Sequence, residues 1–359
     1  MLYIRRVLKE SVKLNLKKNF KKSNFSAITI FIGIFVILFV TSAVVIRQVY
    51  QANLGALSTE KRTISITIAP GSTVSEIALN LKNKGAIKSD WAFEWYVRNN
   101  NLRDELKAGT YLVYTNQDIP TIAKTIASGK VATNLFTILP GKRLDEIRAS
   151  MIKAGFAEAE VDSALNPANY KGHEVLTDLP VVANLEGYLY PESYQKTAET
   201  KPATIVKSAL DELARQLTKE RRQEFARQGL STYQAITLAS TVEREVSNKN
   251  DKPQVAQVFL KRQKIGMNLG SDVTAFYGAI IAGQPPTVAY DSPYNTRIHS
   301  GFPIGPISNV GEASLEAVAY PATTDWLYFV AGDDGKTYFS KTNEEHEALT
   351  KEHCKLLCQ

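Results

Sequence analysis

The stretch ITIAPGSTVSEIALNLKNKG (residues 66–85) governs the fold of the amino-terminal half, because the chain contains it twice. Further on, FTILPGKRLDEIRASMIKAG (residues 136–155) aligns with it without a gap and keeps the Pro-Gly pair, the glutamate and the final glycine. Each copy alternates apolar and polar residues, turns at Pro-Gly, and then carries apolar residues at helical spacing up to a glycine. We therefore expect a strand, a tight turn and an amphipathic helix in each copy.

The segment between the two copies predicts the rest of a small α/β module. Residues 91–100 have a helical pattern, residues 108–114 have a strand pattern, and Asp118 is a suitable N-cap for a helix that runs to Gly129. A strand, two helices and a strand over residues 62–133 resemble a LysM carbohydrate-binding domain. Glycan binding and a spacer that only packs on its neighbour both remain open for this module.

The region from residue 134 to residue 359 is expected to be one mostly helical domain. Helical patterns cover residues 202–216, 233–249 and 252–264, and loops rich in proline and glycine lie between residues 283 and 306. The stretch WLYFVAGDDGKTYFS (residues 326–340) predicts a terminal β-hairpin. The fold class is therefore α+β.

Upstream of the module, residues 25–46 form an apolar run without a charge, long enough as a helix to cross roughly 30 Å of hydrocarbon. A cleaved signal peptide is the competing interpretation, but the run is too long and no clear cleavage site follows it. Residues 1–24 carry a cluster of lysines and arginines against the single acid Glu10, which predicts a cytoplasmic tail. A linker over residues 47–61 would then lead to an extracytoplasmic catalytic region, anchored in the cytoplasmic membrane by a single span.

The basic tail also accounts for the high pI of about 9.1, because the rest of the chain has equal numbers of basic and acidic residues. The charge is therefore a signal of topology, and it predicts no nucleic-acid partner. The sequence leaves open whether Cys354 and Cys358, the two cysteines, form a disulfide.

Motifs for nucleotide, zinc and serine-nucleophile chemistry are missing from the sequence, so we expect neither a metal nor a cofactor. Carboxylates therefore remain as the candidate catalytic groups. In NLEGYLYPESY (residues 184–194), Glu186 stands before Tyr188, Tyr190 and Tyr194. Aromatic surroundings raise a carboxyl pKa, and tyrosine faces can bind sugar rings. The alternative is a glutamate fixed by a backbone amide at a turn.

A second carboxylate site is predicted on the helix that contains QAITLASTVEREVSNK. Glu243 falls on the apolar stripe of this helix with Ile236 and Ala239, and Glu245 lies nearer the edge of the stripe. Glu243 is therefore a candidate for supporting Glu186, and a structural ion pair is the alternative.

Further polar candidates follow in NLGSDVTAFYG and DSPYNTRIHSGFPIGPI. These stretches supply Asp272, Tyr294, Asn295 and Thr296, which we expect in loops that proline and glycine stiffen around a cleft. A plain connection between helices is the alternative.

Five motifs in order carry a resemblance to a known family: LEGYLYPES, LASTVEREV, LGSDVTAFYG, YNTRIHSGFPIGPIS and SLEAVAYPATTDWLYFV. With the apolar run upstream, they resemble the YceG-like (MltG) family of endolytic murein transglycosylases. The resemblance implies a lyase that cuts between N-acetylmuramic acid and N-acetylglucosamine within peptidoglycan strands and leaves 1,6-anhydro ends. It implies Glu186 as the catalytic acid and base, termination of nascent strand growth as the role, and cell-wall synthesis machinery as a further partner.

The chain departs from the usual family choices at six positions, which concern subsite shape more than the reaction: Tyr188, Gly270, Val273, Arg297, Phe302 and Ile304. Two other functions remain. One is a non-catalytic peptidoglycan-binding anchor or scaffold. The other is a hydrolase that uses Glu186 and Glu243 as paired carboxylates and leaves a reducing end.

Overall fold

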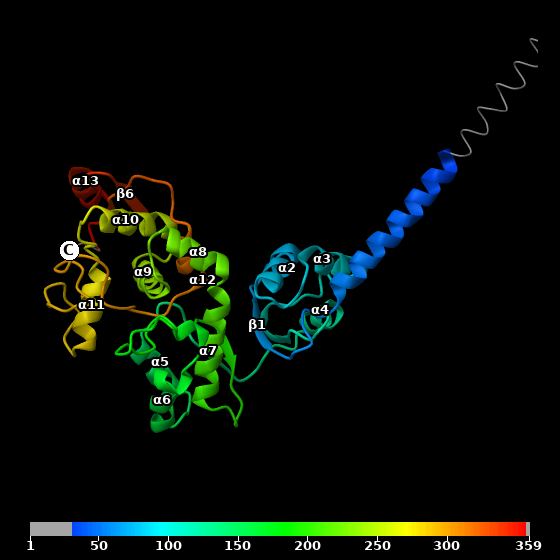
Figure 1. The fold of residues 1–359 in the computed structure, drawn as a ribbon, viewed down its shortest axis with the longest axis horizontal. Helices are drawn as coiled ribbons and strands as arrows, with labels where there is room; N and C mark the ends of the chain where they lie inside the picture. Colours follow the sequence, from blue (N-terminus) through cyan, green and yellow to red (C-terminus); the bar gives the residue numbers. More distant parts are fainter. Residues whose placement is uncertain (1–30, 357–359) are drawn as a thin grey trace, which may run out of the picture. The chain divides into compact units, whose positions relative to one another are not determined.

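The computed structural model describes residues 31–356, and the chain folds into two compact units that divide between Ala132 and Thr133 (Figure 1). The predicted basic tail and the start of the predicted span lie outside the described residues, as does Cys358. Each unit has a hydrophobic core of its own. Both combine helices with short antiparallel strands, which confirms the mixed fold class.

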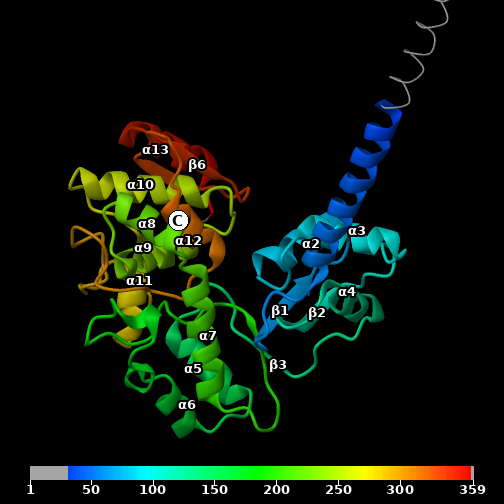
Figure 2. The same cartoon turned by 45° about the vertical axis from the view of Figure 1, so that its right-hand side comes forward.

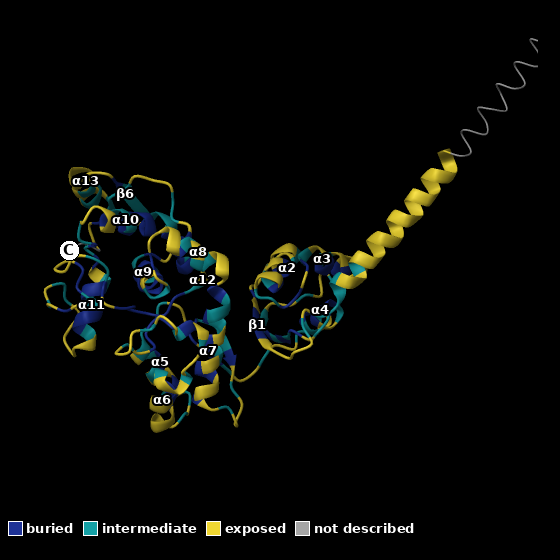
Figure 3. Cartoon of the chain, viewed as in Figure 1, coloured by how far each residue is buried: buried dark blue, intermediate teal, exposed yellow. Residues whose placement is uncertain are grey.

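An apolar helix, Phe31–Leu54, leads into the first unit. At a rise of 1.5 Å per residue it is about 36 Å long, enough to cross a bilayer. The most apolar part of this helix is not buried against the rest of the protein, and Figure 3 shows the helix exposed along most of its length. The helix continues past Ile46, so the first part of the expected linker is helical. The extension is stabilised because Tyr50 and Leu54 pack against the core of the first unit.

The rest of the first unit has the predicted order of strand, two helices, strand and helix. Strands β1 (Thr63–Ile68) and β2 (Gly109–Tyr114) pair antiparallel, with Ile66 opposite Tyr111. Helices α2 (Val74–Asn83), α3 (Asp90–Asn99) and α4 (Ile119–Ser128) cover this ribbon. Ile66, Tyr111 and Phe93 are fully buried among the apolar faces of the helices.

The two copies of the repeat form the same local structure, one in each unit. Gly71 and Gly141 both have left-handed backbone, with φ of +82° and +70°, as the turn before each helix requires. A glutamate three residues into each helix then accepts from the backbone N–H of its N-cap: Glu76 in the first copy and Glu146 in the second. The second copy has a shorter strand, β3 (Leu135–Thr137), which pairs with β4 (Ser193–Gln195).

The second unit is mostly helical, and its core surrounds α9, which Figure 3 shows as largely buried. Its elements are α5 (Leu144–Lys153), α6 (Glu158–Ala164), η1 (Pro167–Tyr170), η2 (Glu174–Leu176), α7 (Pro202–Gln216), α8 (Lys219–Arg227), α9 (Thr232–Glu245), α10 (Lys252–Lys264), α11 (Asp272–Ile281), α12 (Glu312–Ala319), β5 (Tyr328–Ala331), β6 (Thr337–Ser340) and α13 (Asn343–His353). Figures 1 and 2 both show β6 and α13 beside α10, away from α5 and α6.

Helices α7 and α10 begin and end at the predicted residues, and the hairpin β5–β6 is confirmed. Helix α9 ends earlier than predicted because Val246 has extended backbone. One expectation is wrong, because the segment after Ser271 is the helix α11 instead of a loop. The helix α13, which follows the hairpin, was not predicted.

Candidate active site

Glu186 lies in a turn that only glycine allows at the next position. Gly187 has a φ of +86°, and a Cβ atom there would lie 2.5 Å from the Cβ of Pro306. The side chain of Asn184 accepts the Glu186 backbone N–H at 2.9 Å. The Leu-Glu-Gly motif therefore folds tightly against the Gly-Pro-Ile segment, and this contact fixes the direction of the Glu186 side chain.

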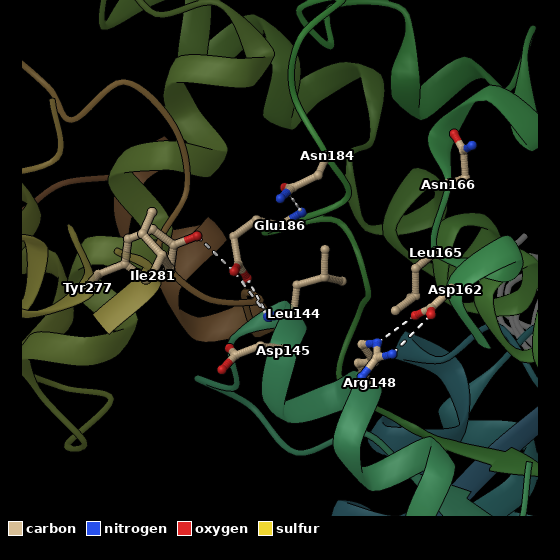
Figure 4. Close-up of a pocket in the computed structure, with 10 residues that line it drawn as sticks. All are labelled: Leu144, Asp145, Arg148, Asp162, Leu165, Asn166, Asn184, Glu186, Tyr277 and Ile281. Carbon is tan, nitrogen blue, oxygen red and sulfur yellow. Dashed lines mark hydrogen bonds and ion pairs between the residues drawn. The ribbon is translucent and has the colours of Figure 1, made fainter. Parts of the chain in front are cut away.

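The Glu186 carboxyl group meets the amino-terminal end of α5 (Figure 4). The Leu144 backbone N–H donates to both carboxyl oxygens, at 3.0 Å each. The Tyr277 hydroxyl, from α11, donates to Oε2 at 3.0 Å. Only 5% of Glu186 is exposed. The turn of the second repeat copy thus presents a helix N-terminus to a buried acid.

Burial raises the pKa of Glu186 to about 7, and the nearby charge of Asp145 acts in the same direction. The hydrogen bonds from Leu144 and Tyr277 favour the ionised form and oppose this rise. The acid is therefore poised between its two protonation states near neutral pH, as a group that both gives and takes a proton requires.

Glu186 lines a cavity of about 340 Å³ in the second unit, at the lower end of the range for ligand sites. The other lining residues are Leu144, Asp145, Arg148, Asp162, Leu165, Asn166, Asn184, Tyr277 and Ile281. Asp145 pairs with Arg143, and Asp162 pairs with Arg148, so the pKa of each of these carboxyls is lowered. Among the acids of this cavity, Glu186 is the one whose pKa is raised.

Asn309 holds the turn that precedes α5, and the sequence alone did not single it out. Its Nδ2 donates to the carbonyl oxygens of Leu139 and Leu189, and its Oδ1 accepts from the Lys142 N–H at 2.8 Å. One side chain thus ties the Pro-Gly turn to the loop that carries Glu186. Its place directly after the Gly-Pro-Ile-Ser motif was the available signal.

The tyrosines after Glu186 do not form the predicted sugar platform. Tyr188 is fully buried, Tyr190 is 5% exposed, and Tyr194 is also buried in the core of the second unit. Burial raises the pKa of all three hydroxyls. The ring beside the acid is instead that of Tyr277, and the half-buried Tyr294 packs edge-on against it at 4.7 Å.

Glu243 lies at the junction of α9, α10 and α12. Its Oε1 pairs with Lys252 at 3.0 Å, and its Oε2 accepts from Ser314 and from the Gly311 N–H. It does not line the cavity. The structural ion pair, left open from the sequence, is therefore present.

Glu245 accepts a hydrogen bond from the Ser271 hydroxyl at 2.5 Å. Glu245 as a whole is partly exposed, but its carboxyl group is enclosed. Burial raises the pKa of this carboxyl to about 7. Ser271 precedes α11, so Glu245 stabilises the start of the helix that carries Tyr277.

The remaining predicted residues organise the loop after α11. Asp272 pairs with Arg297, one of the positions that depart from the family pattern. Asn295 donates to two backbone carbonyls of that loop, and Thr296 accepts from the Ser271 N–H. None of these three side chains lines the cavity. Among residues 31–356, no group of three or more His, Cys, Asp or Glu side chains is placed to hold a metal ion.

Known proteins resemble this chain over most of its length. The model of the YceG-like family matches residues 66–352. An endolytic murein transglycosylase of Bacillus subtilis (strain 168) is 31% identical over 311 residues, which cover 82% of this chain and 85% of that protein. An endolytic murein transglycosylase of Streptococcus pneumoniae (strain D39) is 27% identical over 343 residues. The matched region covers 85% of this chain and 61% of that longer protein.

A solved structure of a YceG-like protein from Listeria monocytogenes is also similar. It is 32% identical, covers 81% of this chain and 100% of its own, and superposes with a TM-score of 0.53. The family model and the B. subtilis relative both match most of the sequence, and the range of the family model includes the turn of the second repeat copy and the Leu-Glu-Gly motif. This chain belongs to the YceG-like family.

Proposed function

We propose that this protein is an endolytic murein transglycosylase, a lyase that cuts peptidoglycan strands internally with Glu186 as its acid and base. The observation that carries the proposal is a single buried carboxyl group, with its pKa raised to about 7, at the wall of a cavity and at a helix N-terminus. The relatives in B. subtilis and S. pneumoniae carry the same activity in their names.

The reaction needs one carboxyl group. Protonated Glu186 donates its proton to the glycosidic oxygen as the bond between that oxygen and the anomeric carbon of N-acetylmuramic acid breaks. The C6 hydroxyl oxygen of the same sugar then bonds to the anomeric carbon, and its proton passes to Glu186. The acid is restored, no water is consumed, and the products are a 1,6-anhydro end and a free 4-hydroxyl end.

The surroundings of Glu186 suit both halves of this cycle. Burial keeps the proton on the acid before the first transfer. The Leu144 N–H and the Tyr277 hydroxyl stabilise the carboxylate that forms when the proton leaves. Tyr188 and Tyr190 support the loop that carries Glu186 by packing in the core of the second unit. Glu243 and Glu245 hold α9 and α11 in place through their hydrogen bonds.

The apolar helix Phe31–Leu54 supports a membrane-anchored protein. The basic tail at residues 1–24 supports a cytoplasmic amino terminus, with both folded units outside the cytoplasmic membrane. Such a placement brings the cavity to the compartment of the murein, where cutting a growing strand would end its elongation beside the synthesis machinery. The boundaries 62–133 and 134–359 remain predictions, and glycan binding and a spacer role both remain open for the LysM-like module.

The competing functions have less support. A hydrolase with Glu186 and Glu243 as its pair is disfavoured because both oxygens of Glu243 are already bonded to Lys252, Ser314 and Gly311. A non-catalytic anchor has no use for a buried acid with a raised pKa beside a cavity.

Glu186→Gln tests the proposal in purified full-length protein acting on isolated glycan strands. Glutamine keeps the shape and can still accept from Leu144, but it has no proton to transfer, so cleavage should fall by roughly 10²- to 10⁴-fold. Glu245→Gln is the comparison, because that carboxyl has the same raised pKa but lies outside the cavity and only supports α11, so this variant should lose far less activity than Glu186→Gln. Equal activity of Glu186→Gln and wild type would refute the assignment.

A further inference from the structure

Three aromatic rings cluster where the apolar helix meets the first unit. The ring of Tyr50 lies 4.8 Å from that of Trp95 and 6.1 Å from that of Trp91. The two tryptophans are one turn apart on α3, at 6.3 Å. They are 43% and 38% exposed, although the opposite face of α3 is fully packed in the core. Large exposed rings gathered on one face call for a partner.

The cluster stands at the height of a membrane interface if the helix spans the bilayer. Ile46 is the last residue of the charge-free apolar run, and Arg47 follows it. Tyr50 is four residues further, about 6 Å along the axis at helical rise. The headgroup layer extends about 5 to 8 Å beyond the hydrocarbon on each side. Tyrosine and tryptophan are enriched in this layer, where a ring can bury its body and hydrate its polar atom.

An apolar groove runs from the aromatic cluster along the apolar helix, toward the residues expected inside the membrane. It has a volume of about 390 Å³ and is lined by Phe39, Ser42, Ala43, Ile46, Arg47, Tyr50 and Trp95. Its mostly apolar lining suits an acyl chain, and Arg47, which also lines it, suits a lipid phosphate. Lys88 and Arg98, both exposed, flank the two tryptophans in the sequence of α3 and its N-terminal turn. Asp90 and Glu94 lie beside the tryptophans on the same helix, where Asp90 pairs with Lys82 and Glu94 accepts a hydrogen bond from Ser75. The charges around the rings are therefore mixed, and the cation that lines the groove itself is Arg47.

We propose that Tyr50, Trp91 and Trp95 form a lipid-binding face that rests in the interfacial layer of the membrane and seats the first unit directly on the bilayer. This inference rests on the proposed membrane span and is independent of the proposed reaction. The same rings could instead stack on sugars. The lipid is favoured because Tyr50 lies about one helical turn beyond the last residue of the apolar run, and the groove is lined by residues of that same helix.

Tryptophan fluorescence in vesicles tests the proposal with the full-length chain. The sequence has three tryptophans, Trp91, Trp95 and Trp326. Trp326→Phe leaves the two on α3 as reporters. The matched control, Trp91→Phe/Trp95→Phe, leaves Trp326, whose indole N–H donates to Gln254 in the second unit and whose ring stacks on Phe339. Both variants are reconstituted into phosphatidylcholine and phosphatidylglycerol vesicles that contain lipids brominated near the headgroup end or the methyl end of the chain.

The Trp326→Phe protein should lose most of its emission, more with bromine near the headgroup than near the methyl end, and the control should keep its emission. Emission that brominated lipid leaves unchanged but added glycan fragments alter would overturn the proposal in favour of a sugar platform. Unchanged emission with both would overturn it as well. If the chain fails to float with the vesicles, the span and this inference both fall, and cleavage of soluble glycan remains a separate result.

Discussion

Removing the Tyr277 hydroxyl should move the pH profile of the enzyme in a direction that the structure fixes. That hydroxyl donates to Glu186 Oε2 at 3.0 Å and favours the ionised carboxylate. A hydrogen bond to a charged group contributes about 1.5–3 kcal/mol, and one pKa unit corresponds to about 1.4 kcal/mol. Tyr277→Phe should therefore raise the pKa of Glu186 by about 1 to 2 units.

The assay is the pH dependence of kcat/KM on soluble glycan strands, because this parameter reports the pKa values of the free enzyme. Glu186 must begin protonated, so activity should fall as the pH rises through its pKa, about 7 in the wild type. In Tyr277→Phe this alkaline limb should lie at a pH about 1 to 2 units higher, whatever the maximal rate.

Tyr170→Phe is the matched control, since it also loses one partly buried hydroxyl, which donates to the Ala164 carbonyl and does not contact Glu186. Its alkaline limb should coincide with that of the wild type. An alkaline limb in Tyr277→Phe that stays in place or moves to lower pH would refute the assignment of Glu186 as the acid, or the role of its hydrogen bonds.

Three further predictions concern the neighbours of Glu186 and the fold that holds them. Asp145→Asn removes a negative charge that raises the pKa of Glu186, so the alkaline limb should move to lower pH, by less than about one unit because this side chain is exposed and screened. Glu243→Gln leaves the buried Lys252 without its charge partner, so the free energy of unfolding should fall by about 3–5 kcal/mol and the melting temperature should fall with it. An unchanged melting curve with lost turnover would assign Glu243 to the chemistry instead. Gly187→Ala should abolish activity, because the added Cβ would lie 2.5 Å from the Cβ of Pro306. Gly172 has nearly the same φ, +85°, but nothing lies within 4 Å of an added Cβ there. Gly172→Ala should therefore lower the free energy of unfolding by only about 1 kcal/mol, as a melting curve would measure.

Local patterns in the sequence were sufficient for the elements that depend on local interactions. The repeat predicted both Pro-Gly turns and the helices after them, including the one whose N-terminus meets Glu186. Apolar periodicity predicted α7 and α10 to the residue. Isolation of Glu186 among apolar neighbours predicted its raised pKa, because burial alone is enough to raise it.

Contacts between residues far apart in the chain could not be predicted in this way. Tyr277 reaches Glu186 only because α11 packs beside α9, and the apolar α11 has no strong helical periodicity to identify it. Position on the apolar stripe of α9 predicted that Glu243 faces inward, but Lys252 as its partner depends on how α10 packs. Tyr188 was expected to offer its ring to a sugar as well as to surround the acid, but it is fully buried. Tyrosine suits both a core and a binding site, so the residue type alone could not decide between them.

The mass of the product ends tests the central claim most directly. Purified peptidoglycan is digested with the wild-type protein, and the new ends are analysed by mass spectrometry without prior reduction. One carboxyl group that gives and then takes a proton should leave ends of 1,6-anhydro-N-acetylmuramic acid, each lighter by one water than a hydrolysed end. Reducing ends alone would show that water is the nucleophile and would contradict the mechanism.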